Sequence, residues 1–429
     1  GDEFRRSALQ QAQGRLLRTG LFDGVVLRPV QSSGRVRDVE LLVNERKRFS
    51  FVFGAGVTAP DDGPRVSGEA RLRNLDGRGL SLWGRGRASV DWRSITLGVL
   101  LPEYRASLGV ELPYLPGLPV RAAITGLLNE ELDEPTYRIS RSGLTIGLDW
   151  RPSNKLNVEG RVEVQLRAPI RVDSVARLNA LSDIPRESPR QHPQVLVLAQ
   201  LSAVLDLRDD RFNPSKGLYL TGTLESTPGA SVPNSPAFGR VSARTVGLIP
   251  LGAGGAGIQV EAAGGIAFGY DGRLPPVEWR FRLGGTSTVR GFRLDAIGPT
   301  GERSGVLETQ GLLGSGGVAR LVPVGGTAFY RYSLQVQLPL PGLKTWRFVI
   351  FHDAGNVVIA GMAPDGIDPG FHPVLHPSVG IGLRRITPIG PLRLELAVRP
   401  ERLTTLGKVF TGEAALADVL QVHFAVGAL

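Results

Sequence analysis

The residues best suited to chemistry in this sequence are its five histidines, because imidazole binds metal ions and transfers protons near neutral pH. Only His372 and His376 have the i, i+4 spacing with which a helix can hold a metal ion. Pro373 and Pro377 follow them, and proline disfavours a helix at these positions. We therefore expect these histidines in loops or turns and predict no metal site.

A second candidate is the glycine-rich segment 284–292, whose backbone N–H groups could hold a phosphate group. No helix is predicted after this segment, although phosphate-binding loops of this kind lead into a helix. The chain also lacks a Gly-x-Ser-x-Gly elbow, a Gly-x-x-x-x-Gly-Lys-Ser/Thr loop and a His-Glu-x-x-His helix. The sequence therefore predicts a protein that is not an enzyme and that needs no cofactor.

The elements that carry these residues are predicted from a turn-rich and alternating sequence. The chain has 56 Gly and 31 Pro among 429 residues, and its mean hydropathy is zero. No apolar run reaches the roughly 18 residues of a membrane-spanning helix. A β-barrel crosses the bilayer with strands that alternate lipid-facing and lumen-facing side chains, so its mean hydropathy stays near that of a soluble protein. The composition therefore permits a membrane barrel.

The basic charge of the chain, formally +10, raises nucleic-acid binding as an alternative. The arginines are scattered through alternating segments, as in Arg71-Leu72-Arg73, and they form no single patch with interleaved aromatic residues. We expect them to contact outer-membrane lipids or to line a polar lumen, and we predict no nucleic-acid partner. The absence of cysteine excludes disulfides and thiolate metal sites.

Residues 1–48 show the pattern of a small α+β unit. Apolar residues at helical spacing predict an amphipathic helix over Ser7–Arg18, which closes at Thr19-Gly20. Two strands are predicted at Gly24–Val30 and Val36–Val43, separated by the turn-prone residues 32–34. This order of one helix and two strands predicts either a truncated domain or a unit supported by the barrel mouth, because so short a unit buries little core by itself.

Residues 49–429 follow period two and predict an all-β transmembrane barrel. Strand-like runs of about ten residues are bounded by turn formers, and at about 24 residues for each strand and connection they predict about 16 antiparallel strands. Long connections are expected at Arg167–Pro193 and Asp271–Gly317. A soluble sandwich or propeller is the alternative, but no fixed repeat period is present. The runs include Arg65–Leu72, Leu80–Val90, Leu144–Trp150, Leu156–Leu166, Gly217–Leu224, Ile258–Ala267, Tyr332–Leu338, Gly380–Arg385, Leu392–Val398 and Leu420–Leu429.

Several motifs of the chain resemble the outer-membrane protein assembly factor superfamily. Phe281–Gly285, Val289–Phe292 and Gly298-Pro299 are similar to the sixth extracellular loop of that family. The N-terminal helix with Thr19–Phe22 resembles the second half of a polypeptide-transport-associated (POTRA) domain. Four further segments are similar to the family in the same order: Asp206–Asp209 with Phe212–Pro214, Gly325-Gly326 with Ser333–Val336, Phe351–Val357, and Gly380–Leu383 with Thr387–Leu392.

The resemblance implies a site inside the barrel. In the family the arginine of this loop, Arg290 within Val289-Arg290-Gly291-Phe292, contacts acidic residues of the barrel wall, which by motif position include Asp353. The family usually has Glu where this chain has Gln335, so we expect a weaker anchor for the loop. A guanidinium in a confined lumen needs a bidentate acceptor to offset its desolvation, and Asp353 can supply one.

The resemblance also implies a lateral seam between the first and last barrel strands. We expect Phe49–Val57 to lie against Leu420–Leu429, with Gly427 at the weakest part of the contact. In the last strand we expect Leu420, Val422 and Phe424 outward, and Gln421, His423, Ala425 and Gly427 inward. The candidate seam residues are Phe49, Phe51, Phe53, Phe424 and Gly427.

The resemblance therefore implies an insertase of the BamA type, embedded in the bacterial outer membrane, with residues 1–48 in the periplasm. A seam with unpaired edges could take up a client strand by β-augmentation. The expected partners are unfolded outer-membrane proteins, outer-membrane lipids and periplasmic accessory proteins. The alternatives are a TamA-like autotransporter assembly factor, a two-partner secretion pore, a passive porin or an outer-membrane enzyme.

Overall fold

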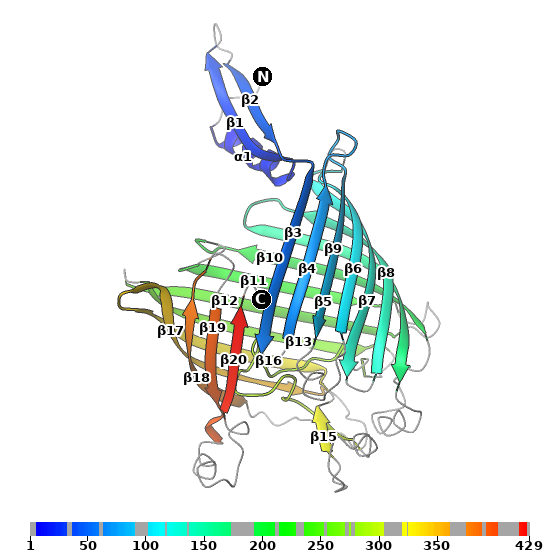
Figure 1. Cartoon of the computed structure of the whole chain (residues 1–429), viewed down its shortest axis with the longest axis vertical. Helices are drawn as coiled ribbons and strands as arrows, with labels where there is room; N and C mark the ends of the chain where they lie inside the picture. Colours follow the sequence, from blue (N-terminus) through cyan, green and yellow to red (C-terminus); the bar gives the residue numbers. More distant parts are fainter. Residues whose placement is uncertain are drawn as a thin grey trace.

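The computed structural model describes residues 6–31, 37–59, 63–90, 102–115, 118–134, 137–172, 193–210, 214–228, 236–252, 255–270, 274–275, 279–303, 320–323, 325–360, 375–387, 392–401 and 420–426. A small N-terminal unit stands at one end of a closed barrel of 16 antiparallel strands (Figure 1). The predicted barrel and its strand number are therefore confirmed.

The barrel is built by strands that each pair antiparallel with the next barrel strand in the chain. A short separate hairpin, β14 (Thr300–Arg303) and β15 (Arg320–Pro323), lies in the connection between the sixth and fifth barrel strands from the end, apart from the barrel sheet. In chain order the barrel strands are β3 (Phe49–Ala59), β4 (Gly63–Leu72), β5 (Ser81–Val90), β6 (Pro102–Leu112), β7 (Val120–Glu134), β8 (Tyr137–Trp150), β9 (Leu156–Val172), β10 (Gln194–Asp206), β11 (Gly217–Ser226), β12 (Phe238–Leu251), β13 (Ala256–Gly269), β16 (Ala328–Leu340), β17 (Leu343–Val358), β18 (His376–Arg385), β19 (Leu392–Val398) and β20 (Leu420–Val426).

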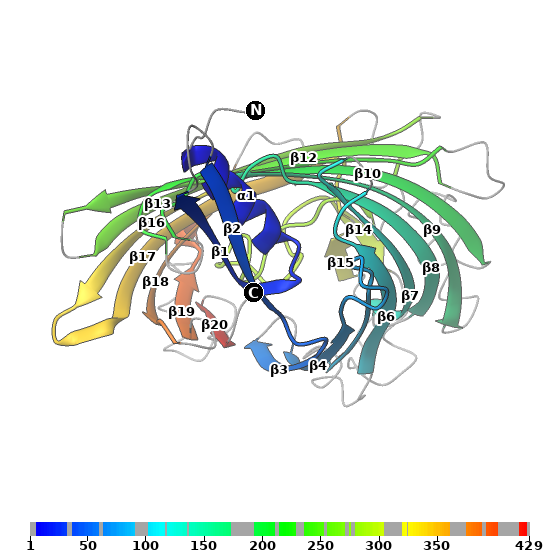
Figure 2. The same cartoon turned by 90° about the horizontal axis from the view of Figure 1, so that it is seen from above.

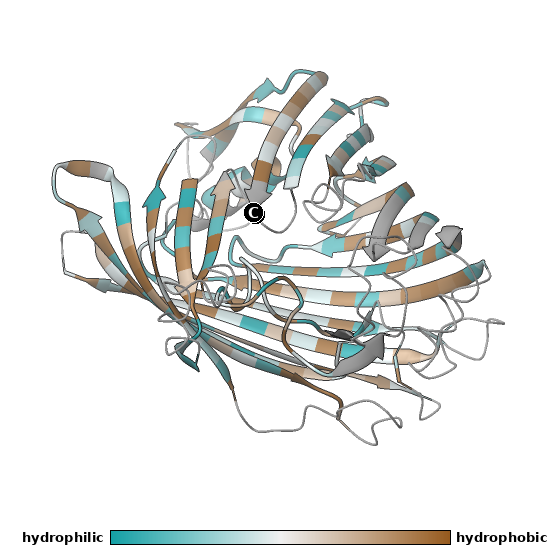
Figure 3. Cartoon of the chain, turned by 60° about the horizontal axis from the view of Figure 1, so that its bottom comes forward, coloured by the Kyte–Doolittle hydropathy of each residue, from teal (hydrophilic) through white to brown (hydrophobic). Residues whose placement is uncertain are grey.

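Side chains alternate across the barrel wall as period two requires. On β8, Leu144, Ile146 and Leu148 are about half exposed on the outer face, as expected for contact with lipid. On β20, Val422 and Phe424 are exposed, whereas His423 is buried, in the predicted arrangement. Figure 3 shows apolar and polar residues alternating along the strands. The outer wall is thus apolar and the lumen is polar.

The strand boundaries differ from prediction mainly at β8 and β9. β8 begins at Tyr137 and β9 extends to Val172, so the first part of the predicted connection Arg167–Pro193 belongs to a strand. Backbone pairing between β8 and β9 continues across a register shift at Arg138/Ile139, where Pro169 also lies in the ladder. A proline and an interrupted alternation hid this extension in the sequence. His376, expected in a loop or turn, begins β18.

The N-terminal unit consists of α1 (Arg6–Arg18) and a hairpin of β1 (Phe22–Gln31) and β2 (Arg37–Glu45). The helix ends in a turn capped by Thr19, whose hydroxyl bonds the Leu16 carbonyl oxygen, and by Gly20 at φ +74°. The Gln13 amide donates to the Val25 carbonyl oxygen at 2.6 Å and holds the helix on the hairpin. No helix among the described residues is long and apolar enough to span a membrane. Seen along the barrel, α1 lies over the opening that the strands enclose (Figure 2).

The seam between β20 and β3 is the weakest join of the barrel. Among the described residues it has three backbone pairs, Phe424 with Ala59, Ala425 with Thr58 and Val426 with Val57. The adjoining pairs β3–β4 and β19–β20 have ten and seven. The rest of β3, Phe49–Gly56, has no partner on that edge within the described part of the chain.

The predicted seam residues are therefore only partly brought together. Phe424 lies in the seam, but Phe49, Phe51 and Phe53 lie on the unpaired part of β3, each more than 60% exposed. The reason is an offset between the two strands. The seven-residue β20 pairs with the C-terminal end of β3, whereas the N-terminal end of β3 extends toward the N-terminal unit (Figure 1). Gly427 lies outside the described residues.

This register predicts which engineered cysteines will form a disulfide in a chain that has none. Thr58→Cys with Ala425→Cys should cross-link under mild oxidation, because paired antiparallel residues have Cα atoms about 4.5 to 5.5 Å apart. Phe53→Cys with Val422→Cys should not cross-link. Non-reducing gels report both yields, and efficient cross-linking of the second pair alone would show that the strands join in another register.

Candidate functional site

The loop between β13 and β16 supplies the candidate site. Phe281 and Gly326 exchange backbone hydrogen bonds of 2.8 and 2.9 Å, and the Ile297 N–H donates to the Leu283 carbonyl oxygen. Gly284 has φ +117°, and a Cβ there would lie 2.2 Å from the Arg293 carbonyl oxygen, so this turn requires glycine. These contacts fold the segment into a compact hairpin.

The hairpin is held against the inner wall by apolar packing. Residues of the loop and of strands β13 and β17 form one buried cluster, made of Ala267, Phe281, Leu283, Val289, Phe292, Ile297 and Val357. Phe329 packs against it from β16, with its ring centre 4.6 Å from that of Phe281. A hydrophobic core inside a polar lumen places the Val289–Phe292 turn at one position on the wall.

Arg290 projects from this turn into a bidentate contact with Asp353 of β17. Its Nε and Nη2 donate to the two carboxylate oxygens at 2.7 Å each, and its backbone N–H donates to the same carboxylate at 3.2 Å. The guanidinium carbon lies 3.4 Å from the centre of the Phe351 ring. Arg290 is 5% exposed and Asp353 is fully buried, so the charges are compensated almost entirely by protein.

A second carboxylate completes the environment of Arg290. Nη1 lies 3.2 Å from Glu395 of β19, and Arg384 of β18 donates to the same Glu395 at 2.6 Å. The Gln335 side-chain oxygen accepts from Arg384 at 2.7 Å and lies 3.4 Å from Arg290 Nη1. Glu395 thus supplies a carboxylate from another strand, and the expectation of a weaker anchor stays a prediction. Arg290 and Arg384 share Glu395, and Arg393 of β19 also lies within electrostatic range of it.

The rest of the Val289–Phe292 turn is fitted closely to the wall. A Cβ on Gly291 would lie 2.4 Å from the Ser378 side chain, so no larger residue fits. Phe292 meets His376 edge-on, with ring centres 5.8 Å apart. Val289 is fully buried. Each of the four residues thus contributes a separate contact with the wall.

His423 links the turn to the seam. This histidine of β20 is 2% exposed, and its Nε2 lies 2.5 Å from the Arg290 carbonyl oxygen. In the sheet it stands beside Glu395 of β19, three positions from Val426 in the seam. The last strand is therefore tied to the loop by a hydrogen bond.

Comparison with known proteins identifies the architecture around this site. The Omp85 superfamily domain matches residues 74–408. The chain belongs to the Omp85 superfamily. Members of this superfamily are non-enzymatic membrane proteins, so the chain is a non-enzymatic β-barrel of an outer membrane of bacterial or mitochondrial type.

Individual relatives of this Omp85 chain are distant. The SAM50-like protein of Schizosaccharomyces pombe is 25% identical over 198 residues, which cover 45% of this chain and 38% of that relative. The crystal structure of BamA from Haemophilus ducreyi lacking POTRA domains 1-3 has a TM-score of 0.72 at 19% identity, covering 98% of this chain and 78% of that one. CdiB from Acinetobacter baumannii has a TM-score of 0.55 at 13% identity, covering 99% and 68%. These likenesses show a shared fold.

Sequence reasoning about this Omp85 barrel missed Glu395, Arg384 and Ser333, which all contact the Arg290 group. A signal for Glu395 was present, because it occupies an inward position between the outward Leu394 and Leu396 in a period-two strand. Glu395 lies 105 residues after Arg290 in the chain, so the sequence gave no indication that the two side chains are in contact. Among the described residues, no group of three or more His, Cys, Asp or Glu side chains could hold a metal ion.

The buried position of Glu395 predicts a large effect of its removal. Glu395→Gln should destabilise the barrel by about 3 kcal/mol, because two guanidinium groups lose their shared carboxylate in a buried site. Glu159→Gln is the matched control, since Glu159 is 35% exposed and its ion pair among the described residues is with Arg161, and it should cost at most about 1 kcal/mol. Denaturant unfolding followed by tryptophan fluorescence measures both. Equal effects would contradict a special role for Glu395.

The link from loop to seam predicts a structural effect of His423→Ala. The Arg290 carbonyl oxygen would lose its partner and β20 its tie to the loop, so the cross-linking yield of the Thr58→Cys, Ala425→Cys pair should fall by about half or more. His352→Ala is the control, because His352 stacks on Tyr332 of the neighbouring strand β16. An unchanged yield in His423→Ala would show that the hydrogen bond does not position β20.

Proposed function

We propose that this chain is a BamA-like insertase that assembles β-barrel proteins in the bacterial outer membrane through the seam between β3 and β20. The observation that carries the proposal is the seam of three pairs beside the edge of β3 at Phe49–Gly56, which has no partner among the described residues. An unpaired strand edge presents backbone N–H and C=O groups that another strand can pair with. Within a bilayer no water satisfies these groups, so pairing with a client strand is favourable.

Membership of the Omp85 superfamily supports client outer-membrane proteins as partners. The lipid-facing aromatic residues Phe49, Phe51 and Phe53 would lie beside an entering strand. They are exposed on the face that also carries the exposed Leu72 of β4. In this proposal they contact both lipid and the nascent strand, which gives the predicted residues a role that does not require pairing with β20.

We further propose that residues 1–48 are the C-terminal part of a POTRA domain on the periplasmic side, followed by the barrel over 49–429. The order α1, β1, β2 supports this assignment. So does the exposure of Val39, Leu41 and Val43 on β2, which leaves apolar surface available to a covering layer. Periplasmic accessory proteins would then bind at this end of the barrel.

The insertase function is tested by measuring how fast a client protein folds when the seam of this chain is open and when it is closed by a disulfide. The chain is reconstituted into liposomes, an unfolded outer-membrane barrel is added, and client folding is followed by heat-modifiability on gels. The Thr58→Cys, Ala425→Cys variant should accelerate folding when reduced and lose the acceleration when oxidised. The control pair Thr125→Cys, Thr145→Cys joins β7 to β8, which are already fully paired, and should accelerate folding in both states.

The same folding assay also tests the contact of Arg290 with the barrel wall. Arg290→Ala should lose most of the acceleration, because Asp353 would be buried without its cation and the turn that holds β20 would be displaced. Arg293→Ala, an exposed arginine of the same loop, should retain it. Acceleration by the oxidised seam variant would contradict insertion through the seam. Steady ion conductance without any acceleration would favour a secretion pore or a porin.

A further inference from the structure

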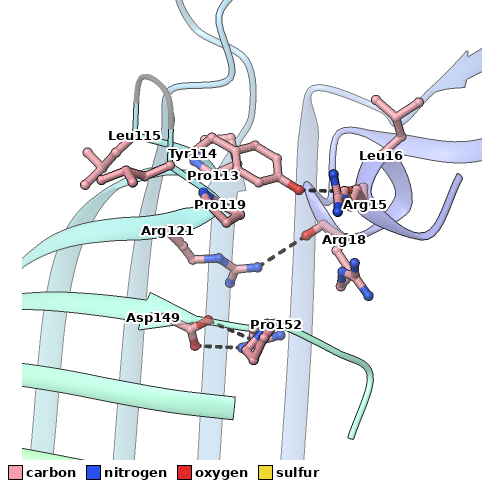
Figure 4. Close-up of a pocket in the computed structure, with 12 residues that line it drawn as sticks. Arg15, Leu16, Arg18, Pro113, Tyr114, Leu115, Pro119, Arg121, Asp149 and Pro152 are labelled. Atoms are coloured by element: carbon pink, nitrogen blue, oxygen red, sulfur yellow. Dashed lines mark hydrogen bonds and ion pairs between the residues drawn. The ribbon is translucent and has the colours of Figure 1, made fainter. Parts of the chain in front are cut away.

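A cavity of about 470 Å³ lies where α1 meets the barrel wall, apart from the Arg290 site (Figure 4). Its lining comes from three places in the chain: the last turn of α1, the connection between β6 and β7, and the region where β8 ends. Leu16, Pro113 and Leu118 supply apolar walls. The loop and seam chemistry described above uses none of these residues.

The charges of the cavity are strongly unbalanced. Arg15, Arg18, Arg121 and Arg151 line it, against a single carboxylate, Asp149. Asp149 forms an ion pair with Arg151, whose Nε lies 2.8 Å from its carboxylate oxygen. Arg121 has Glu111 at 3.2 Å just outside the lining, but Glu111 also pairs with Arg71 at 3.0 Å. The cavity therefore keeps an excess of positive charge.

The helix end that forms one wall is held by hydrogen bonds to the barrel. The Tyr114 hydroxyl donates to the Arg15 carbonyl oxygen at 2.9 Å, and Arg121 donates to the Arg18 carbonyl oxygen at 3.4 Å (Figure 4). Arg18 in turn donates to Asn154. Within the described part of the chain, the Arg15 guanidinium has neither an ion pair nor a hydrogen bond. The backbone of Arg15 is thus held at the cavity, and its exposed guanidinium is available to a ligand.

The strand residues that line the cavity lie on the inner face of the barrel, which bears on the kind of ligand. Arg121 and Asp149 are partners in the β7–β8 ladder and lie on the inner face. The neighbours on the opposite face, Ile124 and Leu148, are about half exposed toward lipid. A lipid headgroup outside the barrel would not reach the inward guanidinium groups, whereas a chain at the mouth of the lumen would.

We propose that this cavity binds carboxylate side chains of an acidic, extended segment of an unfolded polypeptide at the lumen opening beneath α1. The inference rests on the proposed function, because it assigns the segment to a client protein. Guanidinium groups pair with carboxylates through two parallel hydrogen bonds, and the apolar walls accommodate the aliphatic parts of the segment. A bound segment would bridge α1 and the barrel turns, so it would also stiffen their contact.

The test is direct binding of a peptide to the folded full chain in detergent. The probe is a peptide of alternating Gly and Glu with an uncharged fluorophore, followed by fluorescence anisotropy at low salt, and an alternating Gly and Gln peptide is its neutral counterpart. Arg15→Gln with Arg151→Gln should weaken binding of the acidic peptide about tenfold. Arg28→Gln with Arg78→Gln removes the same charge from exposed arginines that do not line the cavity and should leave binding unchanged. Heat-modifiability shows that each variant is folded.

The alternative outcomes separate this proposal from the insertase function. Equal weakening in both double variants would overturn the site in favour of diffuse charge attraction. Binding of vesicles that contain phosphatidylglycerol through Arg15 and Arg151, without peptide binding, would overturn it in favour of lipid. If Arg15→Gln with Arg151→Gln abolishes peptide binding but leaves client folding normal, only the role of this cavity in binding clients is contradicted. Peptide binding by a chain that accelerates no client would contradict only the insertase.

Discussion

The burial of the Arg290 guanidinium is the constraint on which the interior of this barrel depends. A guanidinium remains charged at any pH that a protein meets, so its removal from water must be offset by carboxylates and hydrogen bonds. Asp353 and Glu395 supply the carboxylates from β17 and β19. The glycine turns and the apolar cluster of the loop hold Arg290 where both can reach it. One charged side chain thereby fixes the relative position of a loop and several strands.

The seam follows from a different constraint, the need of strand edges for partners. Within the part of the chain that the structure describes, fifteen of the sixteen joins are made by extended ladders, whereas β20 meets β3 through three pairs. Such a join is weak because each lost pair removes backbone hydrogen bonds that lipid cannot replace. His423 couples this weak join to the Arg290 group through one hydrogen bond to the loop backbone. The stability of the loop and the geometry of the seam are therefore not independent properties of the barrel.

The outer wall and the number of strands were predictable because they depend on local pattern. Alternation along β8 or β20 places every second side chain toward lipid, whatever the neighbouring strand is. Register is not local. Phe49–Val57 and Leu420–Leu429 were expected face to face, but the short β20 meets only the end of β3. The offset depends on where every preceding strand lies around the barrel, and no single segment records it.

The candidate site divides in the same way. The sequence by itself determined that the barrel has a polar lumen and that Arg290 lies in a glycine-rich turn, and the resemblance of its motifs implied Asp353 as the acidic partner. Only the tertiary structure decided that Glu395, Arg384 and His423 join them, since barrel closure brings β18, β19 and β20 beside a loop more than ninety residues earlier in the chain. The physical reason is that alternation specifies the face on which a side chain lies, whereas closure specifies which side chains share that face at the same height.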